Sequence, residues 1–135
     1  MGQIILVTGG ARSGKSAFAE HYAARCAAKH GAQVAYIATA QVYDVEMRHR
    51  VDLHQSRRPA DWSTYEAPFD TEHAIRAAGA EHGVILFDCI TMFLSNDMLQ
   101  YPEEEQERDS FALHVEERIH ALVQAAEEVD ATTIF

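Results

Sequence analysis

The stretch Gly9-Gly10-Ala11-Arg12-Ser13-Gly14-Lys15-Ser16 decides the fold of this chain. It matches G-x-x-x-x-G-K-[ST], the phosphate-binding P-loop motif. The apolar run Ile4-Ile5-Leu6-Val7 precedes it and predicts a short buried strand, and a helical pattern begins at about Ser16. A strand, a glycine-rich loop and a helix in this order are the context in which the motif binds phosphate.

The residue types of the loop fit this chemistry. Gly9 and Gly14 let the backbone turn tightly, so that its N–H groups can surround an anion. The N-terminus of the following helix adds the positive end of its dipole. Lys15 is expected to reach the β- and γ-phosphates, and the hydroxyl of Ser16 to bind Mg²⁺. The loop therefore predicts a nucleoside triphosphate site.

Apolar strand patterns alternate with helical patterns along the rest of the chain. We expect strands over 3–8, 34–38, 62–65 and 84–88, and helices over 16–30, 44–58, 71–82 and 106–129. The alternation predicts an α/β fold with a mostly parallel sheet flanked by helices, and 135 residues suit a single domain over residues 1–135. The last four residues begin a further apolar strand, which we expect to form an exposed sheet edge.

Composition excludes several classes of protein. The net charge of −10 argues against a general nucleic-acid binder. No apolar run is long enough to span a bilayer, and no signal-peptide pattern opens the chain, so we expect a cytoplasmic protein. Cys26 and Cys89 stand in apolar surroundings and are expected to be core residues. The acidic run 103–109 is expected to be a solvated first turn of a helix.

The basic residues are concentrated in a few places. Six of the eleven lie at two places along the chain, namely Arg12, Lys15, Arg48, Arg50, Arg57 and Arg58. This distribution indicates a compact polyanionic ligand, although a solvated basic helix face is the alternative.

Two further residues stand out near these cations. Asp88 ends an apolar strand, where it suits the Mg²⁺ shell of a P-loop protein or, alternatively, caps the next helix. His54 lies in the predicted helix 44–58, with Arg50, Arg57 and Arg58 three or four residues away on the same face. Such a histidine could be a general base, a hydrogen-bond donor to phosphate, a nucleophile or an exposed surface residue.

Further motifs carry a resemblance to a known family. They are Leu6 to Ser16, Tyr36-Ile37-Ala38-Thr39-Ala40-Gln41, Asp44-Val45-Glu46-Met47, Arg50-Val51, His54, Arg58-Pro59, Trp62, Thr64, Glu66, Asp88-Cys89-Ile90-Thr91 and Leu94-Ser95-Asn96. In order and spacing, over about residues 4–97, the chain resembles the bifunctional adenosylcobinamide kinase / adenosylcobinamide-phosphate guanylyltransferases of cobalamin biosynthesis.

The resemblance implies a RecA-like P-loop fold, a homotrimer, and two transferase reactions that use ATP or GTP with Mg²⁺. Adenosylcobinamide would be phosphorylated, and GMP would then be transferred from GTP to that phosphate through a guanylylated histidine. It implies catalytic roles for His54 and Lys15, and Mg²⁺ binding by Ser16 and Asp88. The implied nucleotide-binding residues are Gly9, Gly10, Ala11, Arg12, Ser13, Gly14, Lys15, Ser16, Thr39, Ala40, Gln41, Gln55, Ser56, Arg57, Arg58, Glu66 and Asp88.

Two alternatives remain beside this function: a plain P-loop kinase of a small molecule, and an inactive nucleotide-binding remnant. The family's C-terminal part, with its Asn-Glu-Val-Gly segment, is not found in this sequence. On that basis we expect the 135-residue chain to be less stable than a longer family member and its trimer to be incomplete.

Overall fold

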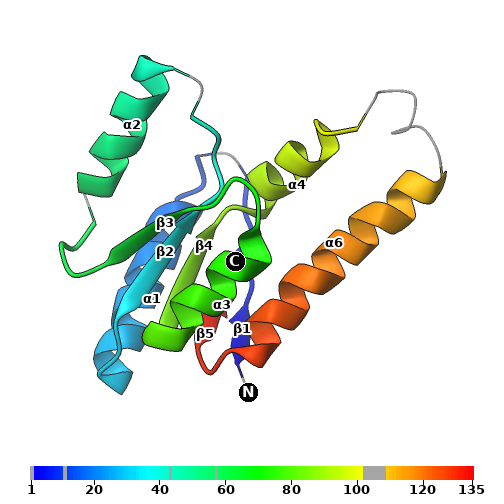
Figure 1. The fold of residues 1–135 in the computed structure, drawn as a ribbon. Helices are drawn as coiled ribbons and strands as arrows, with labels where there is room; N and C mark the ends of the chain where they lie inside the picture. The colour runs from blue at the N-terminus through cyan, green and yellow to red at the C-terminus, as the bar shows by residue number, and fades with distance from the viewer. Residues whose placement is uncertain (1, 11, 43, 57, 102–108) are drawn as a thin grey trace.

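The structure, a computed structural model, describes residues 2–10, 12–42, 44–56, 58–101 and 109–135, with only the backbone at His54 and Asp109. The described elements in chain order are β1 (Gln3–Ile5), α1 (Lys15–His30), β2 (Val34–Ala38), α2 (Val45–Ser56), β3 (Ser63–Glu66), α3 (Thr71–Glu81), β4 (Val84–Asp88), α4 (Ile90–Met98), α6 (Asp109–Glu128) and β5 (Thr132–Ile134). Figure 1 shows them as one sheet with helices on both faces. The predicted acidic turn lies almost wholly outside the described residues.

All the described strands are parallel, in the order β1-β5-β4-β2-β3, which confirms the predicted P-loop α/β class. In this order β5 separates β1, which leads into the phosphate loop, from β4, which ends at Asp88. This separation is the RecA-like arrangement that the sequence resemblance implied.

The expectation that 132–135 forms an exposed edge is wrong. Ile134 of β5 pairs with Ile5 of β1 on one side and with Leu86 of β4 on the other. Thr133 and Ile134 are completely buried. Since β5 is an inner strand, the outer strands of the described sheet are β1 and β3. The sequence pattern predicted this strand but not its position within the sheet. That position depends on β1 and β4, which are distant along the chain.

The sheet carries a separate apolar core on each face because side chains alternate along each strand. Val84 and Leu86 of β4 pack with the alanines of α1, whereas Ile85 and Phe87 pack beneath α3 and α6. Both faces of the parallel sheet are thus covered, as such sheets require. Cys26 packs partly buried against the α1 side, and both cysteines are free thiols.

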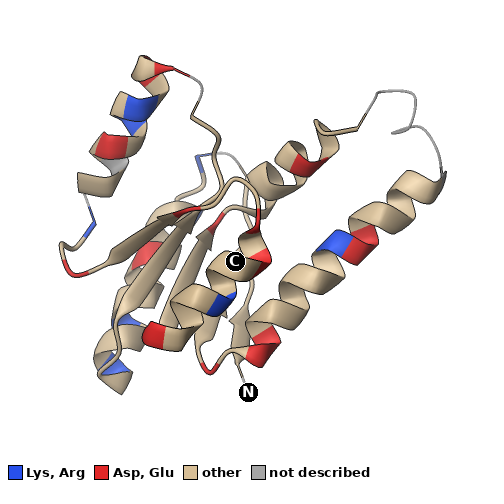
Figure 2. Cartoon of the chain, in the orientation of Figure 1, with Lys and Arg blue, Asp and Glu red and all other residues tan. Residues whose placement is uncertain are grey.

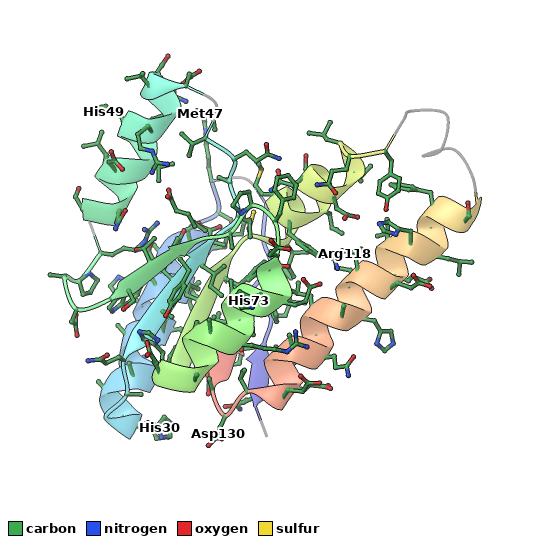
Figure 3. All side chains as sticks on the ribbon, viewed as in Figure 1. His30, Met47, His49, His73, Arg118 and Asp130 are labelled. Atoms are coloured by element: carbon green, nitrogen blue, oxygen red, sulfur yellow. The ribbon has the colours of Figure 1, made fainter. Side chains whose placement is uncertain are left out.

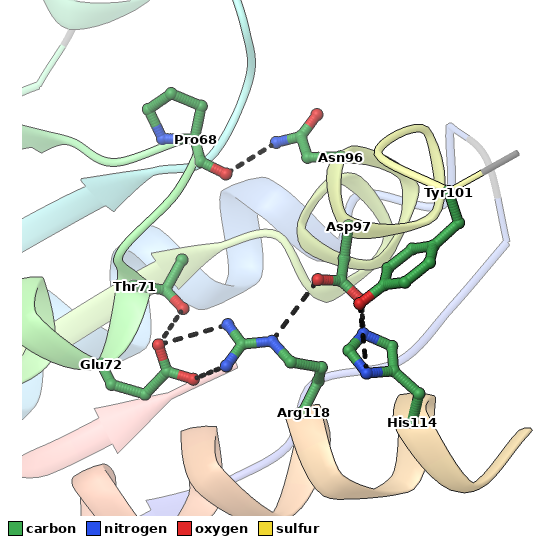
Figure 4. Close-up of polar contacts among 8 residues, drawn as sticks. All are labelled: Pro68, Thr71, Glu72, Asn96, Asp97, Tyr101, His114 and Arg118. Atoms are coloured by element: carbon green, nitrogen blue, oxygen red, sulfur yellow. Dashed lines mark hydrogen bonds and ion pairs between the residues drawn. The ribbon is translucent and has the colours of Figure 1, made fainter. Parts of the chain in front are cut away.

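A polar cluster connects three helices on the α6 side of the sheet (Figure 4). Arg118 of α6 lies between Glu72 of α3, at 2.7 Å, and Asp97 of α4, at 3.5 Å. Nε2 of His114 lies 3.0 Å from the other carboxylate oxygen of Asp97. These contacts fix α4 relative to α3 and α6, and α4 in turn starts directly after the strand end that carries Asp88.

The carboxyl ends of parallel strands meet at one edge of the sheet, where open α/β sheets bind their ligands. The segment after β1, the loops after β2 and β3, and the start of α4 all follow such strand ends. Helix α2 projects from this edge, as Figure 1 shows. No helix in the described part of the chain is long and apolar enough to cross a membrane.

Candidate nucleotide-binding site

The glycine-rich loop between β1 and α1 has a backbone that depends on its glycines. Gly14, directly before the first residue of α1, has φ of 84°, a left-handed value that strains residues with a side chain. A Cβ at Gly9 would lie 2.6 Å from the Ser13 hydroxyl oxygen, so the Ser13 side chain would have to rotate away. The Lys15 ammonium donates to the Gly10 carbonyl at 3.3 Å, so the Lys15 side chain lies back over the loop.

Asp88 lies at the end of β4, and a tyrosine from the neighbouring strand holds its carboxylate. The Tyr36 hydroxyl donates a hydrogen bond to Oδ2 of Asp88. Burial and then the nearby negative charge of Asp88 raise the pKa of the Tyr36 phenol. The phenol therefore stays protonated and remains a donor at any working pH.

A strand-end pocket joins these two parts of the site. It is lined by Ser16 and Glu20 of α1, by Tyr36, Ala38, Ala40, Thr64, Asp88, Cys89 and Met92 at the strand ends, and by Val51, Gln55 and Arg58. Gly9, Ser13, Gly14 and Lys15 line an adjoining hollow over the loop, beside Phe18. Residues between positions 16 and 92 thus surround one space beside the phosphate loop.

The loop after β2 is anchored by a buried asparagine. Asn96 of α4 is 2% exposed and donates from Nδ2 to the carbonyls of Thr39, at 2.6 Å, and Pro68, at 3.1 Å. Its Oδ1 accepts from Nε2 of Gln41 at 3.1 Å. The Thr39 hydroxyl accepts from the Cys89 amide at 2.9 Å. The side chains of Thr39 and Gln41 therefore hold the loop in place through these hydrogen bonds. Of the three predicted residues 39–41, only Ala40 lines the strand-end pocket.

We expect Asn96→Ala to lower the free energy of unfolding by about 2–4 kcal/mol, because two buried carbonyls and one amide lose their partner. Gln41→Ala removes a single one of these bonds and should cost about 1 kcal/mol. Urea denaturation of both variants and the wild type gives the comparison. Equal stability of Asn96→Ala and Gln41→Ala would show that Asn96 does not anchor the loop.

Arg58 lies deeper than the sequence indicated. Helix α2 ends at Ser56, two residues earlier than predicted, so Arg58 does not share a helix face with His54. Instead its guanidinium carbon stands 3.4 Å from the centroid of the Tyr36 ring, and Nε lies 3.9 Å from Oε1 of Glu20. The side chain is 10% exposed, and its buried Nε has no hydrogen-bond partner among the described residues.

The other predicted residues of α2 and β3 have local partners. Arg50 pairs with Glu46 on the same helix at 3.1 Å. Glu66, at the end of β3, accepts two bonds from Arg48, at 2.6 and 3.4 Å, and so joins β3 to α2. Figure 2 shows that charges of both signs share α2. Of the predicted arginines, Arg58 therefore lies outside α2, and Arg50 is engaged in an ion pair on α2 itself.

Some predicted residues fall outside the description. Ala11 and Arg57 lie outside the described residues, and His54 is described only by its backbone, in the last turns of α2. Its neighbour Gln55 lines the strand-end pocket, whereas Ser56 borders a shallower hollow beside Pro59 and Trp62. The exposed His49 on the same helix is labelled in Figure 3. Gly10 and Arg12 are exposed on the loop.

Sheet order, loop and strand-end pocket together define the class of protein: a P-loop nucleotide-binding fold. The family model described as "Cobinamide kinase / cobinamide phosphate guanyltransferase" matches residues 5–135. The chain belongs to this family.

Three curated relatives agree with this assignment. "Bifunctional adenosylcobalamin biosynthesis protein CobP" of Pseudomonas aeruginosa is 46% identical over 94 residues, which cover 70% of this chain and 52% of that protein. The CobU proteins of the same description are 35% identical over 122 residues in Escherichia coli and 36% over 135 in Salmonella typhimurium. Those matches cover 90% and 97% of this chain, but 65% and 72% of the relatives. The chain thus spans between half and three quarters of their length.

Proposed function

We propose that this chain phosphorylates adenosylcobinamide with ATP or GTP and then transfers GMP from GTP to the resulting phosphate. The support is the strand-end pocket, which brings Ser16, Gln55, Arg58 and Asp88 around one space beside the phosphate loop. The two reactions named in the family description both act on nucleotide phosphorus, so a single triphosphate site serves both.

In the kinase step, the hydroxyl oxygen of the aminopropanol arm attacks the γ-phosphorus, and the bond from that phosphorus to the bridging oxygen breaks. The nucleoside diphosphate leaves, and the hydroxyl proton passes to a base or to solvent. Lys15 and the loop amides stabilise the charge that grows on the β–γ bridge. Arg58 lines the pocket, and a guanidinium there suits the oxygens of a phosphate group.

In the guanylyl step, an imidazole nitrogen of His54 attacks the α-phosphorus of GTP, and pyrophosphate leaves. A phosphate oxygen of adenosylcobinamide phosphate then attacks the same phosphorus and releases the histidine. A neutral imidazole is a competent nucleophile near neutral pH. The support for His54 is its place beside Gln55, in the turn of α2 that borders the pocket.

The residues present fit a magnesium ion that arrives with the nucleotide. The Ser16 hydroxyl and the Asp88 carboxylate are hard oxygen donors that line the same pocket. Mg²⁺ usually takes one or two protein oxygens together with substrate phosphates and waters. No cluster of three His, Cys, Asp or Glu residues in the described chain forms a metal site by itself. Bound Mg²⁺ would neutralise phosphate charge there.

Label transfer tests the proposal. With adenosylcobinamide present, γ-labelled GTP or ATP should label the corrinoid phosphate, and α-labelled GTP should label the second product. Label from the γ position alone would support a plain kinase, and nucleotide binding without either transfer would support an inactive remnant. The homotrimer and the cytoplasmic location stay predictions, the first of which light scattering with size-exclusion chromatography tests.

A further inference from the structure

Tyr36 occupies an unusual position between the two charged sides of the site. It lies on β2, is 4% exposed, and packs its ring in the core on the α1 side of the sheet. Its hydroxyl reaches the carboxylate of Asp88, which is itself exposed at the strand end. A phenylalanine would fill the same core space, so packing alone does not require the hydroxyl.

The face of the Tyr36 ring contacts a cationic side chain of the site, that of Arg58. The guanidinium of Arg58 lies 3.4 Å from the ring centroid, a close cation–π contact, and Glu20 approaches it at 3.9 Å. Arg58 lies beyond the end of α2, and its side chain is nine-tenths buried. Its Nε has no hydrogen-bond partner among the described residues. The ring thus holds the guanidinium at the wall of the strand-end pocket, which Arg58 lines.

We propose that Tyr36 is a positioning residue of the nucleotide site, which orients the Asp88 carboxylate through its hydroxyl and the Arg58 guanidinium through its ring. The inference rests on the proposed function, because it assumes that a triphosphate with Mg²⁺ occupies the pocket. Oδ2 of Asp88 accepts from Tyr36, so Oδ1 is the oxygen that would hold the ion or one of its waters. Holding both charged groups on one rigid side chain also keeps them apart, so that they meet the ligand rather than each other.

The hydroxyl and the ring make separable contributions, which gives two informative variants. Tyr36→Phe keeps the ring and removes only the bond to Asp88. We expect it to bind nucleotide normally without Mg²⁺ and to lose about three- to tenfold of the affinity that Mg²⁺ adds. Tyr36→Leu removes the ring as well, so the affinity without Mg²⁺ should also fall by about three- to tenfold.

Calorimetric titration with α,β-methylene GTP, which cannot be cleaved at the α–β bond, measures both quantities. Each protein is titrated once in EDTA and once in excess Mg²⁺, and thermal melting verifies folding. Tyr65→Phe is the matched control, because Tyr65 is a strand tyrosine packed against the opposite core. It should behave as the wild type does.

The outcomes separate this inference from the proposed function. A wild type that does not bind the analogue would overturn the proposed function, and this inference with it. A wild type that binds more tightly with Mg²⁺, beside a Tyr36→Phe variant with the same gain, would overturn the inference alone. An equal loss in EDTA and in Mg²⁺ for Tyr36→Phe would also overturn it, since that result describes a general structural defect.

Discussion

Lys15→Ala should weaken GTP binding by about 10- to 100-fold, the effect of removing charged hydrogen bonds to phosphate. Both transfer activities should fall by a further factor of about 10²–10³, because the ammonium also meets charge that develops in the transition state. In the structure the Lys15 ammonium already lies over the loop, bonded to the Gly10 carbonyl. Equilibrium titration with GTP and steady-state kinetics measure the two effects.

The chain supplies a matched control for this variant. Lys29 is the only other lysine, and it lies in the last turn of α1, at the opposite end of the helix. Lys29→Ala changes net charge by the same amount and should leave GTP binding and turnover unchanged. Undiminished binding and turnover in Lys15→Ala would mean that the loop is not the triphosphate site.

His54→Ala should abolish GMP transfer while GTP binding and the kinase step persist. Under the proposed function the imidazole is needed only where a bond to the α-phosphorus forms, whereas the phosphate loop and Asp88, on other elements, would serve the γ-phosphorus. Loss of a covalent nucleophile removes that route entirely, so we expect a fall of at least about 10³ in the guanylyl step. Separate assays with γ- and α-labelled GTP give the two rates.

His49 provides the control on the same helix, since it is exposed on α2 and precedes His54 along the chain (Figure 3). His49→Ala should leave both steps intact. If His54→Ala lowered the kinase and guanylyl steps equally, the histidine would serve only in nucleotide binding. Guanylyl transfer at the wild-type rate would place the nucleophile elsewhere.

The local parts of the fold could be predicted from sequence because their determinants are local. The P-loop glycines and the apolar run of β4 determine their local conformations by residue type alone. Gly31 likewise ends α1 with φ of 61°. The class of sheet followed from the alternation of strands and helices. Sequence also identified Ser16 and Asp88, which now line one pocket although 72 positions separate their numbers.

What sequence reasoning missed depends on tertiary contacts. The place of β5 within the sheet is set by β1 and β4, not by its own residues. Helical periodicity predicted that α2 extends to Arg58. In the structure Arg58 lies outside the helix, where its guanidinium contacts the ring of Tyr36. Asn96 bridges the loops after β2 and β3, and no local pattern distinguishes such an asparagine from a surface one. The available signal was the motif Leu94-Ser95-Asn96, which belongs to the set that carried the family resemblance.

The central claim is that His54 becomes guanylylated from a triphosphate held by the phosphate loop. Intact-protein mass spectrometry after incubation with Mg²⁺ and GTP, without corrinoid, tests it directly, followed by peptide mapping under basic conditions that preserve a phosphoramidate. The account predicts one added GMP per chain, lost in acid, mapped to His54, and absent from Lys15→Ala and His54→Ala. Folded protein that binds GTP but gains no GMP, or an adduct at another residue, would contradict it.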